Sequence, residues 1–310
     1  MVSEGHGFGK VILFGEHFVV YGLPGIASAL GDKTTAIVEP AEKTEIVDNR
    51  PETPGYKEKK AGQMKESMEF IWKASGVDPE KTPVKITLAG NLIATSGTGA
   101  SAASCAAIAR ALNRHFNLCF DDDKINQIAY EGEKGYHGTP SGIDNSCATF
   151  GGLIWFEKNL EGGPNKIEKI RAGKKIEIVE INSGMTADTK EVVADVKKKK
   201  GENPDEFEKI FSDYRDVVNE ARKALEDGGT EKIGQLMDRN QELLRKIGVS
   251  NDKIEEIIRM AKENGAIGAK LTGTGRGGYV IALTPGRDLQ EKVAKSMEGA
   301  GFMVLRTTIG

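Results

Sequence analysis

The segment from Tyr136 to Gly152, YHGTPSGIDNSCATFGG, contains one acidic residue, Asp144, among small, neutral and turn-forming residues. Pro140 marks a loop, and Ser141 is a residue type that caps helices, so we expect Asp144 in the first turn of a short helix. A carboxylate there could simply complement the helix dipole. Beside a lysine, it could also take the proton of a substrate hydroxyl. The segment alone leaves both interpretations open.

Two glycine-rich segments could bind phosphate. The first, SGTGASAAS, leads directly into a segment with helical periodicity, and the N-terminus of a helix attracts phosphate oxygens. Gly97 and Gly99 would let the backbone approach a ligand closely, and Ser101 offers a hydroxyl to a phosphate or a metal ion. The second, GTGRGG, runs into a strand pattern instead. Close helix packing by small residues is the alternative for the first segment, and a tight turn is the alternative for the second.

Other phosphate-binding motifs fit less well. Both glycine-rich segments formally match the dinucleotide fingerprint or its alanine variant, but only the first opens a helix, with Asp121 following about 20 residues later. A dinucleotide-binding domain would also give no function to the other motifs of the chain, which are described below. The GxxxxGK[ST] pattern is absent, which excludes an ordinary P-loop.

The elements that would position these residues alternate between strands and helices. Hydrophobic periodicity predicts strands at residues 11–14, 85–88, 151–156, 176–181, 279–283 and 302–309, and helices at 61–76, 101–116, 207–225, 254–261 and 288–299. We expect a hairpin tip or mobile loop at 41–60, a hairpin loop at 158–175, and a solvated helix end at Lys197–Lys200. The pattern predicts an α+β chain of two domains, residues 1–180 and 181–310.

Composition describes an ordinary globular protein of 310 residues, with 38% hydrophobic and 29% charged residues. The net charge of −3 argues against a nucleic-acid partner. The longest uncharged run, His17–Gly31, is shorter than the roughly 20 residues of a membrane span, and the N-terminus lacks the apolar core of a signal peptide. Cys105, Cys119 and Cys147 lack metal-type spacing, so we expect buried, reduced thiols and a cytoplasmic protein.

Four segments together resemble the GHMP kinase family, in the form found in its mevalonate kinases. GKVILFGEHFVVYG is similar to the first motif, SGTGASAAS to the ATP-phosphate loop GLGSSAA, HGTPSGIDN to the segment with the catalytic aspartate, and AKLTGTGRGGYVIAL to the third motif KLTGAGGGGC. Their order covers essentially the whole chain, and the combination of GEH with HGTPSGIDN is the specific part. The resemblance implies a two-domain α+β GHMP kinase fold, with a ribosomal protein S5 domain 2-like N-terminal domain, a ferredoxin-like C-terminal domain and a site in the cleft between them.

The resemblance implies roles for the polar residues of these motifs. Asp144 takes the catalytic position and Lys10 lies beside it, although a lone lysine would ordinarily be a surface residue. Ser101 and Glu133 take the positions of Mg²⁺ ligands, whereas Glu133 could otherwise pair with a lysine on an exposed helix face. The ATP-phosphate loop comprises Gly97, Thr98, Gly99, Ala100, Ser101 and Ala102.

Three further residues take substrate-binding positions. Glu16 and His17 match residues that contact mevalonate, and Thr189 matches a threonine near the transferred phosphate. His17 could instead be a core histidine with its hydrogen bonds satisfied, and Thr189 no more than a helix cap.

The implied activity is phosphorylation of mevalonate at its primary (C5) hydroxyl by ATP with Mg²⁺, giving 5-phosphomevalonate in isoprenoid biosynthesis. The alternatives are a relative that acts on another small hydroxy acid or a sugar, and a ligand-binding pseudokinase of the same fold. Several positions depart from the family motifs: Phe8, Ile93, Thr98, Ala100, Arg276 and Tyr279. None of these removes a proposed catalytic side chain. Arg276 could point into solvent or supply positive charge to an anion. The sequence leaves the oligomeric state open, with a homodimer as one possibility.

Overall fold

The computed structural model describes residues 2–95 and 97–310. They form two compact units, unit 1 with the residues up to Lys10 and Ala29–Gly151, and unit 2 with Val11–Ser28 and Gly152–Gly310. The boundary expected near residue 180 lies inside unit 2, so the compact units divide the chain at different points from the expected domains. One reason is that Gly25–Ser28 pair with the strand at residues 153–156.

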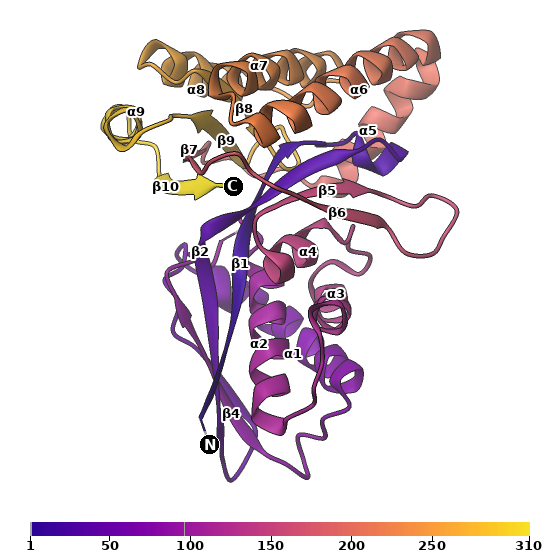
Figure 1. Cartoon of the computed structure of the whole chain (residues 1–310), viewed down its shortest axis with the longest axis vertical. Helices are drawn as coiled ribbons and strands as arrows, with labels where there is room; N and C mark the ends of the chain where they lie inside the picture. The colour runs from indigo at the N-terminus through magenta and orange to yellow at the C-terminus, as the bar shows by residue number, and fades with distance from the viewer. Residues whose placement is uncertain (1, 96) are drawn as a thin grey trace. The chain divides into compact units, whose positions relative to one another are not determined.

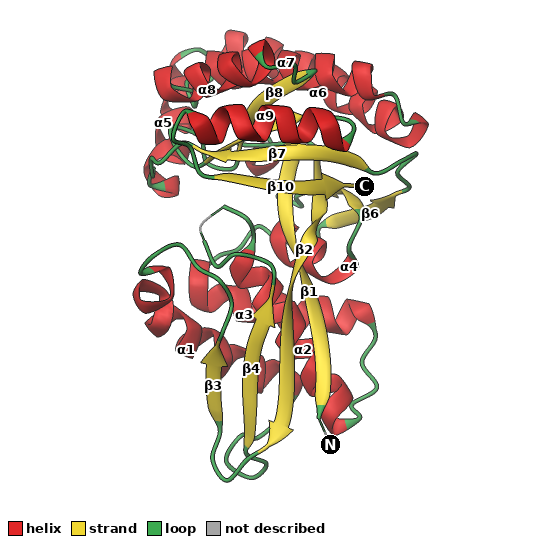
Figure 2. Cartoon of the chain, turned by 90° about the vertical axis from the view of Figure 1, so that its left-hand side faces the viewer, coloured by secondary structure: helices red, strands yellow, loops and turns green. Residues whose placement is uncertain are grey.

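Unit 1 places helices on one side of its strands (Figures 1 and 2). β2 (Gly25–Pro40) pairs antiparallel with β4 (Val84–Gly90) through residues 34–40, and β3 (Glu45–Asp48) pairs parallel with β4. The helices are α1 (Tyr56–Ser75), α2 (Ala100–Phe116), α3 (Asp122–His137) and α4 (Ile143–Phe150). The N-terminal part of β1 (Ser3–Phe14) also belongs to this unit.

The small residues of α2 allow β1 to approach this helix very closely. A Cβ atom added to Gly7 would lie 2.1 Å from the Ala103 carbonyl oxygen, and one added to Gly5 would lie 2.3 Å from that of Ala107. Close packing, the alternative raised for the first glycine-rich segment, is therefore a property of the helix body. The start of the same helix remains available for ligand chemistry.

Unit 2 contains a four-stranded antiparallel sheet with the strand order β10-β7-β9-β8. The strands are β7 (Ile176–Asn182), β8 (Gly268–Thr272), β9 (Tyr279–Leu283) and β10 (Val304–Ile309). The helices are α5 (Thr189–Glu202), α6 (Pro204–Asp227), α7 (Thr230–Lys246), α8 (Asp252–Glu263) and α9 (Arg287–Gly299). A hairpin of β5 (Leu153–Glu157) and β6 (Lys166–Ile170) pairs with β2, and a short 3₁₀ helix covers Val19–Tyr21.

The predicted strands and helices are present, but other elements were not predicted, including the long β2, α3 and α7. The strand and helix patterns named above each fall within or overlap an observed element of the same type, and Lys197–Lys200 lie near the end of α5. The expectation of a loop at 41–60 is wrong, because β3 and the first turns of α1 occupy part of it. The 158–175 segment likewise contains β6. Strands as short and polar as β3 and β6 give too little periodicity to detect.

The cysteines follow the expected pattern at two of three positions. Cys105 and Cys147 are buried, but Cys119 is exposed, which corrects the expectation for it. Cys119 has a left-handed backbone (φ 56°) in the exposed loop between α2 and α3. No helix in the described part of the chain is long and apolar enough to cross a membrane.

Candidate active site

Lys10 and Asp144 meet in unit 1 although 133 residues separate them in the sequence. The Lys10 Nζ atom lies 3.2 Å from Asp144 Oδ2, with the lysine side chain 7% and the aspartate side chain 28% exposed. The same ammonium donates to the Gly97 carbonyl oxygen at 3.4 Å, and the Lys10 amide donates to the Thr98 carbonyl at 2.8 Å. Lys10 is therefore not a surface lysine. It joins the aspartate to the first glycine-rich segment.

Asp144 lies in the first turn of α4, as predicted. The residue that caps this helix is Gly142, with a left-handed φ of 93°, and not Ser141. Ser141 still contributes, because its hydroxyl accepts a hydrogen bond from the Ile143 amide at 3.3 Å. The positive end of the α4 dipole and the Lys10 ammonium thus both lie beside the Asp144 side chain.

The first glycine-rich segment forms a turn that opens α2. Gly97 and Gly99 have φ angles of 98° and 72°, which side-chain-bearing residues rarely adopt, and Gly99 is the N-cap of the helix. No side chain among the described residues caps the helix, so the amides of its first turn can face an anion. Ser96, the first residue of the motif, lies outside the described residues. Asp121 caps α3 by accepting from the Lys124 amide, so it has a structural task of its own.

Ser101 and Glu133 approach each other at the start of α2 and the end of α3. Glu133 is 1% exposed, and its Oε1 atom has no hydrogen-bond partner among the described residues. His137 lies between the two, with its Nε2 atom 3.5 Å from the Ser101 hydroxyl and 3.8 Å from Glu133 Oε2. Sequence reasoning missed His137, although its spacing of four residues from Glu133 places both on one helix face.

Burial raises the pKa of Glu133 to about 8, and the neighbouring charge of Asp144 acts in the same direction. The Ser101 hydroxyl and the Lys10 ammonium oppose this rise. The carboxyl group is thus held where a nearby cation would favour its ionised form. An exposed pairing with a helix lysine, the alternative weighed for Glu133, does not occur.

Glu133 makes the stability of the metal-free protein depend on pH. Between its unfolded pKa near 4.5 and its folded pKa of about 8, the carboxyl is protonated in the folded state and ionised in the unfolded state. We therefore expect the free energy of unfolding to fall as pH rises through this window, by an amount on the order of a few kcal/mol. Urea denaturation in EDTA at several pH values measures this slope. Glu133→Gln should flatten it, and an equal slope in the variant would contradict the assignment.

The oxygen atoms of Ser101 and Glu133 suit Mg²⁺ rather than a metal ion that is coordinated by protein side chains alone. The described residues include no group of three or more His, Cys, Asp or Glu side chains that could hold a metal ion. Mg²⁺ commonly takes only one or two protein oxygens, together with phosphates and waters. The unpartnered, buried Oε1 of Glu133 and the Ser101 hydroxyl are oxygen ligands of that kind.

Glu16 and His17 lie in unit 2, where both are buried. The Glu16 carboxylate forms a fully buried ion pair with Lys270 of β8, and the Lys270 ammonium also donates to the Leu271 carbonyl oxygen at 2.6 Å. Burial raises the pKa of Glu16 and lowers that of Lys270, while their mutual attraction opposes both shifts. The structure thus gives Glu16 the task of holding its segment in place. The motifs of the sequence do not identify Lys270 as its partner.

His17 has a left-handed backbone, with a φ of 61°, and its Nε2 atom lies 2.6 Å from the Thr274 carbonyl oxygen. A carbonyl can only accept, so Nε2 carries the proton. Burial lowers the pKa of His17, which favours the neutral imidazole. Its Nδ1 atom is buried, has no partner among the described residues and must therefore be an acceptor. Only one of the two ring nitrogens of His17 therefore has a hydrogen-bond partner among the described residues.

Thr189 and the second glycine-rich segment are also in contact. Asp188 caps α5, so Thr189 is its first residue rather than its cap, and its hydroxyl lies 2.9 Å from that of Thr274. The GTGRGG segment connects β8 and β9 as a turn with left-handed backbone at Gly273, Gly275, Arg276 and Gly278. The turn interpretation of this segment is therefore confirmed.

Arg276 neither points freely into solvent nor remains available for an anion. Its NH1 atom lies 2.6 Å from Asp195 Oδ2 of α5, and its Nε atom donates to the Gly248 carbonyl oxygen at 3.0 Å. The left-handed backbone (φ 52°) costs energy in any residue except glycine. These contacts explain how an arginine persists at a position that favours glycine.

Arg276→Gly should therefore change the KM values for both substrates by less than about twofold, because the exposed ion pair contributes little and glycine relieves the backbone strain. Steady-state kinetics at low ionic strength test this expectation, with Asp195→Ala as the matched variant that removes the partner. A KM that rises in Arg276→Gly but not in Asp195→Ala would show that the guanidinium binds an anion.

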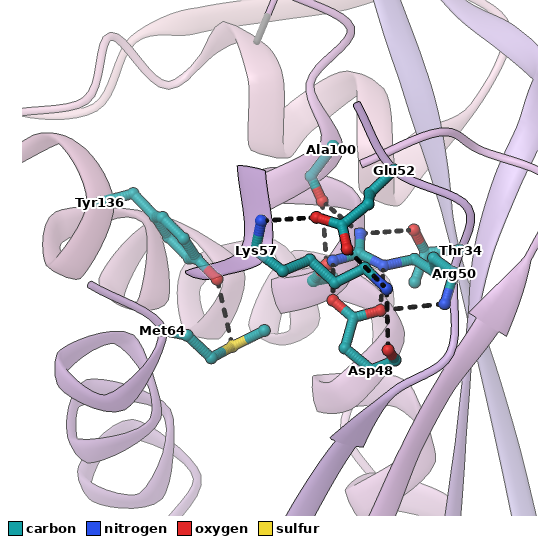
Figure 3. Close-up of polar contacts among 9 residues, drawn as sticks. Thr34, Asp48, Arg50, Glu52, Lys57, Met64, Ala100 and Tyr136 are labelled. Carbon is teal, nitrogen blue, oxygen red and sulfur yellow. Dashed lines mark hydrogen bonds and ion pairs between the residues drawn. The ribbon is translucent and has the colours of Figure 1, made fainter. Parts of the chain in front are cut away.

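A cavity of about 570 Å³ in unit 1 borders the start of α2. Aromatic and sulfur-containing side chains form much of its wall, and both basic and acidic residues line it, the acidic ones being Glu45, Asp48 and Glu69. Figure 3 labels Asp48, Arg50, Lys57, Met64, Ala100 and Tyr136 of this lining. The apolar group consists of Ile46, Tyr56, Met64, Met68, Trp72 and Tyr136, and the basic group of Arg50, Lys57, Lys60 and Lys65. Ala100 and Ser101 complete the border, so the cavity is continuous with the first glycine-rich segment.

Comparison with known proteins identifies the class to which this fold and site belong. Residues 63–152 match the family description "GHMP kinases N terminal domain", and residues 221–301 match "GHMP kinases C terminal". The chain belongs to the GHMP kinase family, and the fold is the two-domain GHMP kinase fold that the sequence predicted.

The relatives are more specific than the family. A mevalonate kinase of Pyrococcus horikoshii is 32% identical over 97% of this chain and 93% of the relative, and one of Thermococcus gammatolerans is 32% identical over 97% and 94%. The crystal structure of L. major mevalonate kinase in complex with R-mevalonate has a TM-score of 0.94 and 36% identity, covering 99% of this chain and 95% of that one. Lactococcus lactis galactokinase, at 17% identity and a TM-score of 0.70, shares the fold alone.

Proposed function

We propose that this chain transfers the γ-phosphoryl group of ATP to the primary (C5) hydroxyl of mevalonate, giving 5-phosphomevalonate for isoprenoid biosynthesis. The contact between Lys10 and Asp144 carries the proposal, because it supplies a base and its cation beside a turn that can hold phosphates. The mevalonate kinases among the relatives support the choice of acceptor. A pseudokinase would have no reason to keep this pair.

The proposed mechanism follows from positioning and charge. Asp144 accepts the proton of the C5 hydroxyl while the hydroxyl oxygen bonds to the γ-phosphorus of ATP. The bond between the γ-phosphorus and the β-phosphate oxygen breaks, which releases ADP. The Lys10 ammonium, 3.2 Å from Asp144, stabilises both the ionised base and the developing alkoxide. The free amides at the start of α2 face the charge of the phosphates.

Glu133 and Ser101 are the proposed ligands of Mg²⁺, since one offers an unpartnered buried oxygen and the other a hydroxyl near it. Bound Mg²⁺ would neutralise charge on the β- and γ-phosphates. The cavity beside Ser101 would hold the nucleoside of ATP, because aromatic and apolar walls suit the flat base and the lysines Lys57, Lys60 and Lys65 suit the phosphates.

Glu16, His17 and Thr189 are proposed to bind mevalonate. Because the His17 Nδ1 atom is an acceptor, it suits a hydroxyl of mevalonate rather than the carboxylate. The buried Glu16 would act by fixing the position of His17, its neighbour in the chain. The Thr189 hydroxyl would lie near the transferred phosphate.

An ADP-release assay over a small panel of alcohols tests the proposal. The panel contains mevalonate, phosphomevalonate, galactose and 4-hydroxybutyrate, with ATP and Mg²⁺ in excess, and Asp144→Asn provides the background rate. We expect mevalonate to give the highest kcat/KM. Faster turnover of galactose or 4-hydroxybutyrate would indicate a relative with another acceptor, and no turnover above background would indicate a pseudokinase.

A further inference from the structure

Arg50 is a buried arginine directly beneath the start of α2. Its side chain is 4% exposed and forms a two-pronged ion pair with Asp48, with Nε 2.9 Å from Oδ1 and NH2 2.6 Å from Oδ2 (Figure 3). Its NH1 atom donates to the Thr34 hydroxyl at 3.2 Å and to the Ala100 carbonyl oxygen at 3.1 Å. None of the motifs discussed above includes Arg50.

These contacts join three separate elements through one guanidinium. Asp48 ends β3, Thr34 belongs to β2, and Ala100 is the first residue of α2. A buried ion pair of this kind is a poor way to gain stability, because apolar residues of similar volume often stabilise as well or better. What the arginine adds is a fixed geometry, since its planar fork sets the direction of each hydrogen bond.

The contact with Ala100 reaches Ser101 through a single peptide group. The Ala100 carbonyl and the Ser101 amide belong to the same planar trans unit, so their C=O and N–H bonds point in opposite directions. The Ala100 carbonyl also accepts from the Ser104 hydroxyl at 2.9 Å, so the Arg50 guanidinium adds a second bond that helps to fix the direction of the carbonyl and, with it, that of the Ser101 N–H. The guanidinium also polarises the peptide group, which strengthens the N–H as a donor.

We propose that Arg50, oriented by Asp48, is a positioning residue for the phosphates of ATP, acting through the Ala100–Ser101 peptide. This inference rests on the proposed function, in which the first turn of α2 binds the phosphates. Arg50 fixes the direction of the Ser101 amide and the place of its hydroxyl. Lysine could replace the charge but not the geometry, because a single ammonium cannot hold Asp48 with two parallel bonds and reach Ala100 at the same time.

The test separates phosphate binding from nucleoside binding. Isothermal titration calorimetry measures the Kd values of ADP with Mg²⁺ and of adenosine for the wild-type chain and for Arg50→Lys. We expect Arg50→Lys to weaken ADP binding about tenfold and to leave adenosine binding within about twofold, because only ADP uses the phosphate contacts. An arginine that serves only as cavity wall or fold support would affect both ligands equally.

Two further variants keep the result interpretable. Arg110→Lys is the matched control, because Arg110 also joins a carboxylate, Asp122, to a main-chain carbonyl, that of His6, in the same unit. It should change neither Kd. Asp48→Asn keeps Arg50 in place but weakens its orientation, so it should reproduce the loss selective for ADP to a smaller extent. If circular dichroism shows that Arg50→Lys is unfolded, the Kd values of Asp48→Asn test the proposal in its place.

The possible results distinguish the positioning role of Arg50 from the proposed function. Equal weakening of ADP and adenosine, or unchanged ADP affinity in folded Arg50→Lys or Asp48→Asn, overturns the positioning role while ADP binding by the wild-type chain upholds the proposed function. A wild-type chain that binds no ADP overturns the proposed function and the positioning role together.

Discussion

Asp144→Asn is expected to fold normally and to lower kcat by about 10²–10⁴-fold, the usual contribution of a positioned general base. Asparagine has nearly the same shape, so it fits the first turn of α4, but it cannot accept the proton and leaves the Lys10 ammonium without its ionic partner. The KM for ATP should change little, because Asp144 acts on the acceptor hydroxyl. Steady-state kinetics with mevalonate as the acceptor measure both effects.

Asp122→Asn is the control for this prediction. It removes another unit 1 carboxylate that pairs with a cation, since Asp122 Oδ1 lies 2.8 Å from Arg110. Asp122 lies at the start of α3, at the opposite end from Glu133, so its loss should leave kcat unchanged. Near-normal turnover by a folded Asp144→Asn would show that Asp144 serves only the helix dipole and that the proton leaves by another route.

The contact between Lys10 and Asp144 illustrates what local patterns can and cannot reveal. Asp144 could be singled out by its setting in a helix turn, whereas Lys10 was singled out only by the resemblance to GHMP kinases. Their proximity depends on β1 lying against α2 and on α4 packing near both, which no periodicity in the chain encodes. The resemblance to GHMP kinases supplied the pairing, and the glycines of β1 supply its physical basis, because Gly5 and Gly7 allow the backbone to touch α2.

The burial of Glu133 could have been predicted from the sequence. Ile125, Ile128, Ala129, Glu133 and Tyr136 are buried and recur at helical spacing, so they share one face of α3. A glutamate on the apolar face of a helix indicates either a buried partner or a ligand. The many charged residues between these positions concealed the pattern. Once the helix is recognised, the spacing of four residues places His137 beside Glu133, so its position could also have been predicted.

Lys270 carried a similar signal that local reasoning missed. β8 has the sequence GAKLT, in which a lysine stands between apolar residues in a strand whose first four residues are buried. A buried lysine requires an acidic partner, but the sequence does not say which of 46 acidic residues it is. Glu16 is 254 residues away, and only the packing of its segment against β8 brings the two together.

Lys270→Met is expected to lower the free energy of unfolding of unit 2 by about 3–5 kcal/mol. Methionine fills much of the volume of the lysine chain, but it leaves the Glu16 carboxylate buried without its cation. The Oε2 atom of Glu16 has no hydrogen-bond partner among the described residues, and a neutral neighbour such as the Asn240 amide cannot replace the charge of the ammonium. Urea denaturation followed by Trp155 fluorescence in a Trp72→Phe background measures the effect, because Trp155 is buried in unit 2.

Two comparisons show whether the buried charge is the cause. Lys262→Met removes a lysine that pairs with Asp238 in the same unit, but both side chains are at least 30% exposed, so its cost should stay below about 1 kcal/mol. Replacing the whole pair, in Glu16→Leu/Lys270→Met, removes the unpaired charge and should recover most of the stability lost in Lys270→Met alone. If Lys270→Met costs no more than Lys262→Met, the carboxylate must find water or another donor on losing its lysine. If instead the double variant is as unstable as the single one, the loss comes from packing around Lys270, and the ion pair does not hold the Glu16–His17 segment against β8.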